Sequence, residues 1–159
     1  SLFLQNFRQR PVFKYFSLLF YGRYKRPTVL YSITTDSSNR SKFVSGRCDE
    51  QIASEAHIDS HKNYLKIIVL LSDVGPENGP TTMVNKSTTH PIMRSHYHEK
   101  ATKNTSELIS QIEAMKVADD CGTTELVGKA GDVFVVNTKN LHWAGSFRSG
   151  MREILWLYY

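Results

Sequence analysis

Short apolar blocks, separated by polar turns, recur along most of this 159-residue chain. Blocks rich in β-branched and aromatic residues and bounded by Gly, Pro, Asn, Asp or Ser are typical of β-strands. Strands are predicted within residues 28–35, 65–71, 81–84, 128–137, 141–145 and 151–159. The block LKIIVLL at 65–71 is apolar almost throughout, which is the pattern of a strand covered on both faces.

Helical periodicity is expected in two places only. Residues 11–24 carry aromatic side chains at helical spacing and predict a helix whose aromatic stripe packs on a sheet. In the polar stretch 86–124, Asn104 followed by Glu107 predicts a helix start in an insertion between strands. The apolar face of this second helix is expected at Leu108, Ile112 and Met115. Because strands dominate and do not alternate with helices, the pattern predicts a mainly β sandwich or barrel.

Composition and charge change this picture little. The length is that of one domain with one core, and 40% hydrophobic and 22% charged residues are ordinary for a globular protein. No apolar run approaches the ~20 residues of a membrane span, and no signal peptide is recognisable. Cys48 and Cys121 lack a metal-binding or redox spacing, which favours reduced thiols and a cytoplasmic localisation.

The net charge of +5 suits an anionic partner. The basic residues are scattered, however, and no nucleic-acid-binding module is recognisable, so we expect a small-molecule partner and no nucleic acid. Nothing in the sequence indicates the oligomeric state.

His57 and Asp59 are the first candidates for chemistry. Residues two apart on an extended strand point to the same side, so both side chains can touch one ion. Two imidazole nitrogens and one carboxylate oxygen on one face of a metal form the triad of non-haem Fe(II) oxygenases. His142, on a short predicted strand, is the candidate for the third ligand.

Arg152 is the candidate anion-binding residue. It opens the last predicted strand, where alternation places it on the face shared by Ile154, Trp156 and Tyr158. A guanidinium among such neighbours is expected to be desolvated, and a buried guanidinium needs an anion. Arg148 lies instead in the turn SFRSG, where we expect it to be solvated.

The other ionisable residues of interest have no assigned role: His61, His90, His96, His98 and Lys66. His61 continues the spacing of the proposed ligands, but a place behind them or at the surface is favoured over direct ligation. His96 and His98 form a second possible metal pair without a third ligand nearby, which favours a solvated loop. Lys66, within an apolar strand, either extends to the rim or meets an anion.

Three stretches together resemble the phytanoyl-CoA dioxygenase family of Fe(II)/2-oxoglutarate oxygenases. They are His57-x-Asp59, LKIIVLLSDVGPENGP at 65–80, and AGDVFVVNTKNLHWAG at 130–145 with Arg152 after it. The resemblance covers residues 57–159, and its most specific part is the spacing from Asp132 to His142 to Arg152. It implies a double-stranded β-helix, a jelly-roll or cupin-like barrel of two antiparallel sheets with the iron at its mouth.

The resemblance also implies a domain organisation. Residues 1–159 would form a single dioxygenase-like domain, in which residues 1–56 provide an N-terminal helix and strand as support. Residues 57–159 would form the metal-binding jelly-roll core, with residues 86–124 as a helical insertion.

The chemistry that the resemblance implies is hydroxylation of an unactivated C–H bond of a small molecule. Fe(II), 2-oxoglutarate and O2 would be required, and succinate and CO2 would be co-products. His57, Asp59 and His142 would hold the iron, and Arg152 would pair with the distal carboxylate of 2-oxoglutarate. Because Asp59 keeps the carboxylate that halogenating relatives lack, hydroxylation or a related desaturation is implied.

Two alternatives stay open: a non-catalytic jelly-roll binding protein, and a cupin-like protein that holds another metal in the same ligand set. Arg152 discriminates between them and the oxygenase, because a plain metal site needs no buried guanidinium opposite it. The substrate is not identified by the sequence.

Overall fold

The computed structural model describes residues 27–35, 42–43, 55–61, 65–100 and 106–159, and four isolated positions near the N-terminus. Most of the helix predicted at 11–24 lies outside the described residues. Across the described ranges, no helix is long and apolar enough to cross a membrane.

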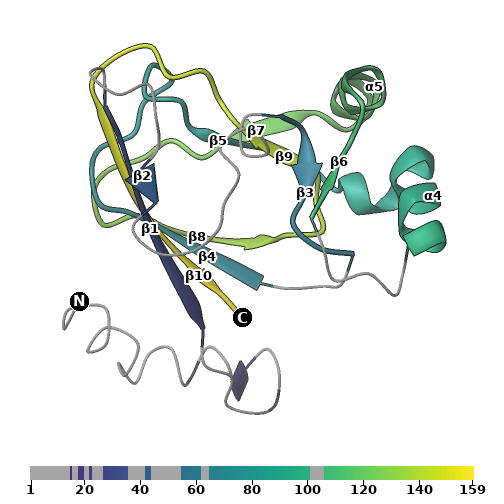
Figure 1. The fold of residues 1–159 in the computed structure, drawn as a ribbon, viewed down its shortest axis with the longest axis horizontal. Coiled ribbons are helices and arrows are strands. Elements are labelled where there is room, and N and C mark those ends of the chain that lie inside the picture. Colours follow the sequence, from purple (N-terminus) through teal and green to yellow (C-terminus); the bar gives the residue numbers. More distant parts are fainter. Residues whose placement is uncertain are drawn as a thin grey trace.

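Two five-stranded antiparallel sheets face each other (Figure 1). The first sheet has the order β2 (Lys42–Phe43), β1 (Thr28–Thr35), β10 (Met151–Tyr158), β4 (Leu65–Leu70) and β8 (Val133–Asn137). The second has the order β6 (Glu107–Leu108), β3 (His57–Ile58), β9 (His142–Ala144), β5 (Thr81–Val84) and β7 (Thr123–Glu125). Because the chain passes repeatedly from one sheet to the other, the fold is the predicted double-stranded β-helix.

The strands predicted from the apolar blocks are all present. The longest pairing joins β1 to β10, from Thr28 opposite Tyr158 to Thr35 opposite Met151. On its other side β10 pairs with β4, and β4 pairs with β8. Both neighbours of β4 are therefore strands, and its side chains are buried or half-buried on both faces, as its apolar sequence predicts.

Three apolar clusters form the core. The outer face of the first sheet carries Val29, Ile67, Leu155, Leu157 and Tyr159. Between the sheets lie Ile68, Leu70, Val74, Met83, Leu126 and Ile154. The outer face of the second sheet and its helices contribute Ile58, Val84, Met93, Tyr97, Ile109, Ala114, Val117 and Leu141. Packing on both sides of the second sheet fixes the strands that carry the candidate ligands.

The polar stretch 86–124 covers the outer face of the second sheet (Figure 1). It contains the 3₁₀ turn η1 (Ser87–Thr89) and the helices α4 (Pro91–Lys100) and α5 (Gln111–Cys121). It also supplies the two edge strands of that sheet, β6 and β7. This stretch is therefore part of the sheet as well as its helical cover.

The predicted start of the second helix is wrong. Glu107 lies in strand β6, and α5 begins at Gln111 behind Ser110, whose Oγ accepts a hydrogen bond from the Glu113 N–H at 3.3 Å. Ser110 and Glu113 are a capping pair six residues further along, and the helix begins behind them. The expected apolar face is accordingly exposed, with Leu108 at 44%, Ile112 at 84% and Met115 at 58%. Ala114 and Val117 are buried instead.

Candidate metal centre

His57 and His142 lie directly opposite each other on neighbouring strands. They are register partners of β3 and β9, and their ring centroids are 4.3 Å apart. Strand β3 ends at Ile58, so Asp59 reaches the imidazoles from a bend in which its N–H donates to the Thr138 carbonyl at 3.1 Å. The side chains of His57 and Asp59 lie close together, as predicted, although strand β3 ends before Asp59 and is shorter than expected.

The three side chains form one group whose ligand atoms lie within 4.8 Å of one another. His57 Nε2 is 3.5 Å from Asp59 Oδ1, and His142 Nε2 is 3.6 Å from Asp59 Oδ2. Both histidines are buried, and Asp59 is half-buried. Two nitrogens and a carboxylate oxygen therefore meet around a single point, which is the donor set expected for a first-row transition metal.

Backbone carbonyls orient both imidazoles. His57 Nδ1 is 2.7 Å from the Glu55 oxygen, and His142 Nδ1 is 2.8 Å from the Asn140 oxygen. A carbonyl only accepts, so each Nδ1 carries a proton, and in the neutral imidazole each Nε2 keeps a lone pair on the side of Asp59. His142 Nε2 is buried and has no hydrogen-bond partner in the part of the chain that the structure describes. An orphaned lone pair of this kind fits a metal ion as its missing partner.

Lys66 is the cation beside this group. Its Nζ donates to Asp59 Oδ2 at 3.0 Å and lies 4.7 Å from the ring centroid of Tyr158. Burial alone would lower the pKa of Lys66, but Tyr158 and Asp59 raise it above its ordinary value. Of the two roles open for Lys66 in the sequence, the structure shows the contact with an anion.

The electrostatics of the site favour the protonation states that a metal requires. Burial raises the pKa of Asp59, but the ammonium of Lys66 outweighs burial and holds that pKa well below its usual range. Burial lowers the pKa of His142. The carboxylate is therefore ionised and His142 is neutral at neutral pH, as metal ligation demands.

Arg152 lies on the inner face of the first sheet, as predicted. It is 7% exposed, and its Nη2 donates to Thr34 Oγ1 at 3.3 Å. No carboxylate in the part of the chain that the structure describes forms an ion pair with it, and burial lowers its pKa. Arg148 is exposed, as expected for the turn SFRSG. Among the described residues, Arg152 is thus a buried cation without an anionic partner.

A second polar group, not predicted from the sequence, adjoins the triad. Glu107 accepts from His61 Nε2 at 2.6 Å and from His96 Nδ1 at 3.1 Å, and His96 Nε2 is 3.4 Å from Glu113. His61 is buried, which excludes the surface alternative. His96 lies half-buried in α4, so the solvated loop predicted for it is wrong. We name His61, Glu107 and His96 the carboxylate bridge, because they join the bend after β3 to β6 and α4.

The remaining histidines lie elsewhere. His90 Nε2 is 3.1 Å from Asp120 Oδ2, a residue of α5, and takes no part in the triad. His98 belongs to α4, but its side chain is outside the described part of the structure. No local sequence signal could have revealed Glu107, because its two histidine partners are 46 and 11 residues away.

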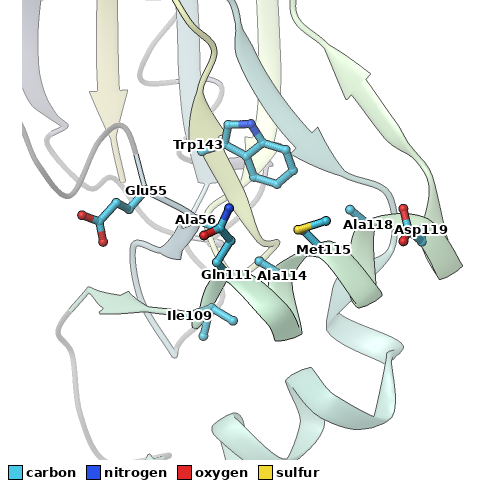
Figure 2. A pocket seen from close by; sticks show the side chains of 9 residues that line it. All are labelled: Glu55, Ala56, Ile109, Gln111, Ala114, Met115, Ala118, Asp119 and Trp143. Atoms are coloured by element: carbon cyan, nitrogen blue, oxygen red, sulfur yellow. The ribbon is translucent and has the colours of Figure 1, made fainter.

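A cavity of about 570 Å³ opens on the other face of the ligand-bearing strands. Figure 2 shows Trp143 directed toward α5, with Met115 and Ala118 of that helix opposite and Glu55 at the far end. Trp143 follows His142 on β9, so the two side chains point to opposite faces of the sheet. The cavity therefore lies behind the triad and does not include it.

Comparison with known proteins identifies a family and a set of similar solved structures. Residues 46–153 match the family model for phytanoyl-CoA dioxygenase. The chain belongs to the phytanoyl-CoA dioxygenase family. This confirms the resemblance carried by the His-x-Asp pair and the segments around His142. No curated protein sequence matches the chain.

Solved structures support the fold of this family member. EvdMO1 is similar with a TM-score of 0.59 and 18% identity, over 96% of this chain and 31% of that one. AviO1 from Streptomyces viridochromogenes Tue57 is similar with a TM-score of 0.55 and 16% identity, over 95% of this chain and 57% of that one. The chain therefore spans about a third of EvdMO1 and somewhat more than half of AviO1.

Proposed function

We propose that this chain is an Fe(II)- and 2-oxoglutarate-dependent dioxygenase that hydroxylates an unactivated C–H bond of a small molecule. Iron, when bound, supplies the coupling of 2-oxoglutarate decarboxylation to hydroxylation, with one atom of O2 ending in succinate and the other in the product hydroxyl. The carboxylate carbon lost from 2-oxoglutarate leaves as CO2. Membership of the family and the donor set of the triad support this proposal.

The triad residues have distinct tasks. His57 and His142 would present the lone pair of Nε2 to the metal, because both Nδ1 protons are engaged by backbone carbonyls. Asp59 supplies the negative charge. Lys66 holds one carboxylate oxygen of Asp59 and so orients that side chain. These residues would hold Fe(II) by one face and leave the opposite positions for 2-oxoglutarate and O2.

Arg152 would bind the distal carboxylate of 2-oxoglutarate. Its planar fork suits a two-bond contact with a carboxylate, and its burial strengthens that contact. The observation that carries the proposal is a combination found among the described residues: His142 Nε2 lacks a hydrogen-bond partner, and the buried Arg152 has no anion in contact. The first needs a cation and the second an anion, and Fe(II) with a 2-oxo dicarboxylate meets both needs.

An anaerobic titration tests the proposal. Metal-free protein receives Fe(II) and then 2-oxoglutarate, and the visible charge-transfer band of the chelated keto acid is followed. We expect the band in the wild type and its loss in His57→Ala. Arg152→Ala should require at least about 30-fold more 2-oxoglutarate, because a buried charge loses its partner. His90→Ala is the matched control, since His90 pairs with Asp120 and not with the triad.

Two results would point elsewhere. Fe(II) binding without a band in the folded wild type would contradict the dioxygenase and favour a binding protein of the same fold. Tight Zn(II) binding together with an unchanged response of Arg152→Ala would favour a differently metallated cupin-like protein, because such a site makes no use of the guanidinium.

A further inference from the structure

The cavity behind the triad, between β9 and α5, has the size of a small-molecule site. Its volume is about 570 Å³, and small-molecule sites in proteins commonly enclose ~300–1,000 Å³. Trp143 lines it, whereas the neighbouring His142 points to the other face of the sheet. We name this space the outer cavity. Because the sheet lies between it and the triad, neither the proposed metal nor 2-oxoglutarate would fill it.

Small side chains create this space. Ala114 and Ala118 lie one turn apart on α5, and both line the outer cavity together with Ala56. Ala114 is buried, and Ala118 is half-buried against the outer cluster of the second sheet. Both therefore face the sheet but are too short to reach it across the cavity. A leucine at position 118 would occupy part of the space.

Trp143 forms the wall of the outer cavity opposite α5. Its side chain is half-buried, and Figure 2 shows the indole directed toward the helix, with Met115 on the other side. An indole ring attracts cations through its electron-rich face, and the thioether of methionine adapts to irregular apolar shapes. The walls therefore suit a ligand with an apolar body and a positive group.

The charge of the lining points the same way. Glu55 and Asp119 both line the outer cavity and lie toward opposite ends of it in Figure 2. None of the described lining residues is basic, although the chain as a whole carries a net charge of +5. A concave site lined by one sign of charge attracts ligands of the opposite sign. The outer cavity is thus complementary to a cation and disfavours an anion.

We propose that the outer cavity binds a small organic ammonium ion. Its apolar body would lie between Trp143 and the alanines of α5, and its positive group would lie near the carboxylates of Asp119 and Glu55. This site is separate from that of the proposed dioxygenase and lies on the opposite face of the same sheet.

The test compares two probes of the same size, the cation 2-phenylethylamine and the neutral 2-phenylethanol. Each is titrated into isotope-labelled metal-free protein, and the indole N–H signals are followed by NMR. The chain has two tryptophans, and Trp156, which packs between the sheets, is the internal control. The amine should shift the Trp143 signal with a Kd in the millimolar range, at least about fivefold tighter than the alcohol, and leave Trp156 unchanged.

Two variants locate the binding and its charge dependence. Ala118→Leu should weaken the amine at least about tenfold without lowering stability in urea, because the added side chain fills existing space. The double variant Glu55→Gln with Asp119→Asn changes two exposed side chains and should reduce the affinity for the amine to near that of the alcohol. Asp120→Asn is the matched control, because Asp120 contacts Lys116 and His90 and does not line the outer cavity.

Three results would overturn the proposal. Equal affinity for the amine and the alcohol would show an apolar patch without preference for a cation. A shift of Trp156 without one of Trp143 would place the amine between the sheets. Unchanged binding in both the Ala118→Leu and the double variant would place it elsewhere on the surface. The measurement needs neither metal nor keto acid, so its result is independent of the proposed dioxygenase activity.

Discussion

The two faces of the second sheet differ sharply in chemistry although they are built from the same short strands. On β3, His57 faces the barrel interior and Ile58 packs under the helices. On β9, His142 faces inward and Trp143 is directed toward α5 (Figure 2). Adjacent residues thus divide the tasks of ligation and packing, because side chains alternate across a strand. Packing on the outer face therefore fixes the strands that carry the candidate ligands, although none of the ligands belongs to the outer cluster.

The largest effect on stability is expected when a buried side chain on the outer face of the second sheet is truncated. Ile58 is fully buried within the cluster beneath α4 and α5, so Ile58→Ala should lower the free energy of unfolding by about 3 kcal/mol. Urea denaturation of the metal-free protein measures this. Because no ligand is removed, the folded fraction should still bind Fe(II). A variant of wild-type stability would contradict the role of the outer face.

The matching change on the inner face should act on binding instead. His57→Ala removes one of three ligands and should weaken Fe(II) binding at least 100-fold, beyond the ~10–100-fold typical of residues that only support ligands. Unfolding of the metal-free protein should change by about 1 kcal/mol, the worth of the hydrogen bond to the Glu55 carbonyl. Anaerobic competition with a coloured chelator measures the affinity. Equal losses of stability in His57→Ala and Ile58→Ala would erase the distinction between the faces.

Much of this division could be predicted from the sequence. The apolar blocks predicted the strands, and the spacing of His57, Asp59, His142 and Arg152 predicted residues that the fold brings to the barrel interior. Strand alternation is a local rule, which explains why it succeeds at β10. The same rule predicts that Arg152 and Ile154 share one face of the strand, and both side chains are buried.

The contacts made by the polar stretch could not be predicted. Leu108, Ile112 and Met115 look like the apolar face of a helix, yet α5 begins at Gln111 and buries Ala114 and Val117 instead. Glu107 joins the carboxylate bridge through partners far away in sequence. Periodicity carries no information about such long-range pairs.

The carboxylate bridge offers an intermediate test, because it links the helical cover to the bend that carries Asp59. Glu107→Gln keeps the shape of the side chain. Its amide has only one acceptor oxygen, however, so it cannot replace the two carboxylate oxygens that accept from His61 and His96. We expect a loss of about 1–2 kcal/mol in stability, measured by urea denaturation. Glu113→Gln is the control and should cost under about 0.5 kcal/mol, because the Glu113 side chain is 40% exposed and its contact with His96 is longer, at 3.4 Å. Equal effects of the two variants would show that the bridge adds nothing.

The smallest effect is expected on the solvent side of α5. Ile112 is 84% exposed, so Ile112→Ser should change the free energy of unfolding by less than about 0.5 kcal/mol. The same replacement at Val117, which is fully buried in the outer cluster, serves as the contrast and should be severely destabilising. If Ile112→Ser destabilised the fold as Val117→Ser does, the assigned phase of the helix would be wrong.

The most direct measurement is the affinity for 2-oxoglutarate with and without Fe(II), taken by anaerobic calorimetry on the wild type. The proposed metal lies on the second sheet and the anion-binding Arg152 on the first, and 2-oxoglutarate would contact both. Fe(II) should therefore tighten 2-oxoglutarate binding by at least about tenfold, and 2-oxoglutarate should tighten Fe(II) binding by the same factor. If 2-oxoglutarate binds equally well with and without Fe(II), or never binds, the triad and Arg152 do not share a ligand and the account is contradicted.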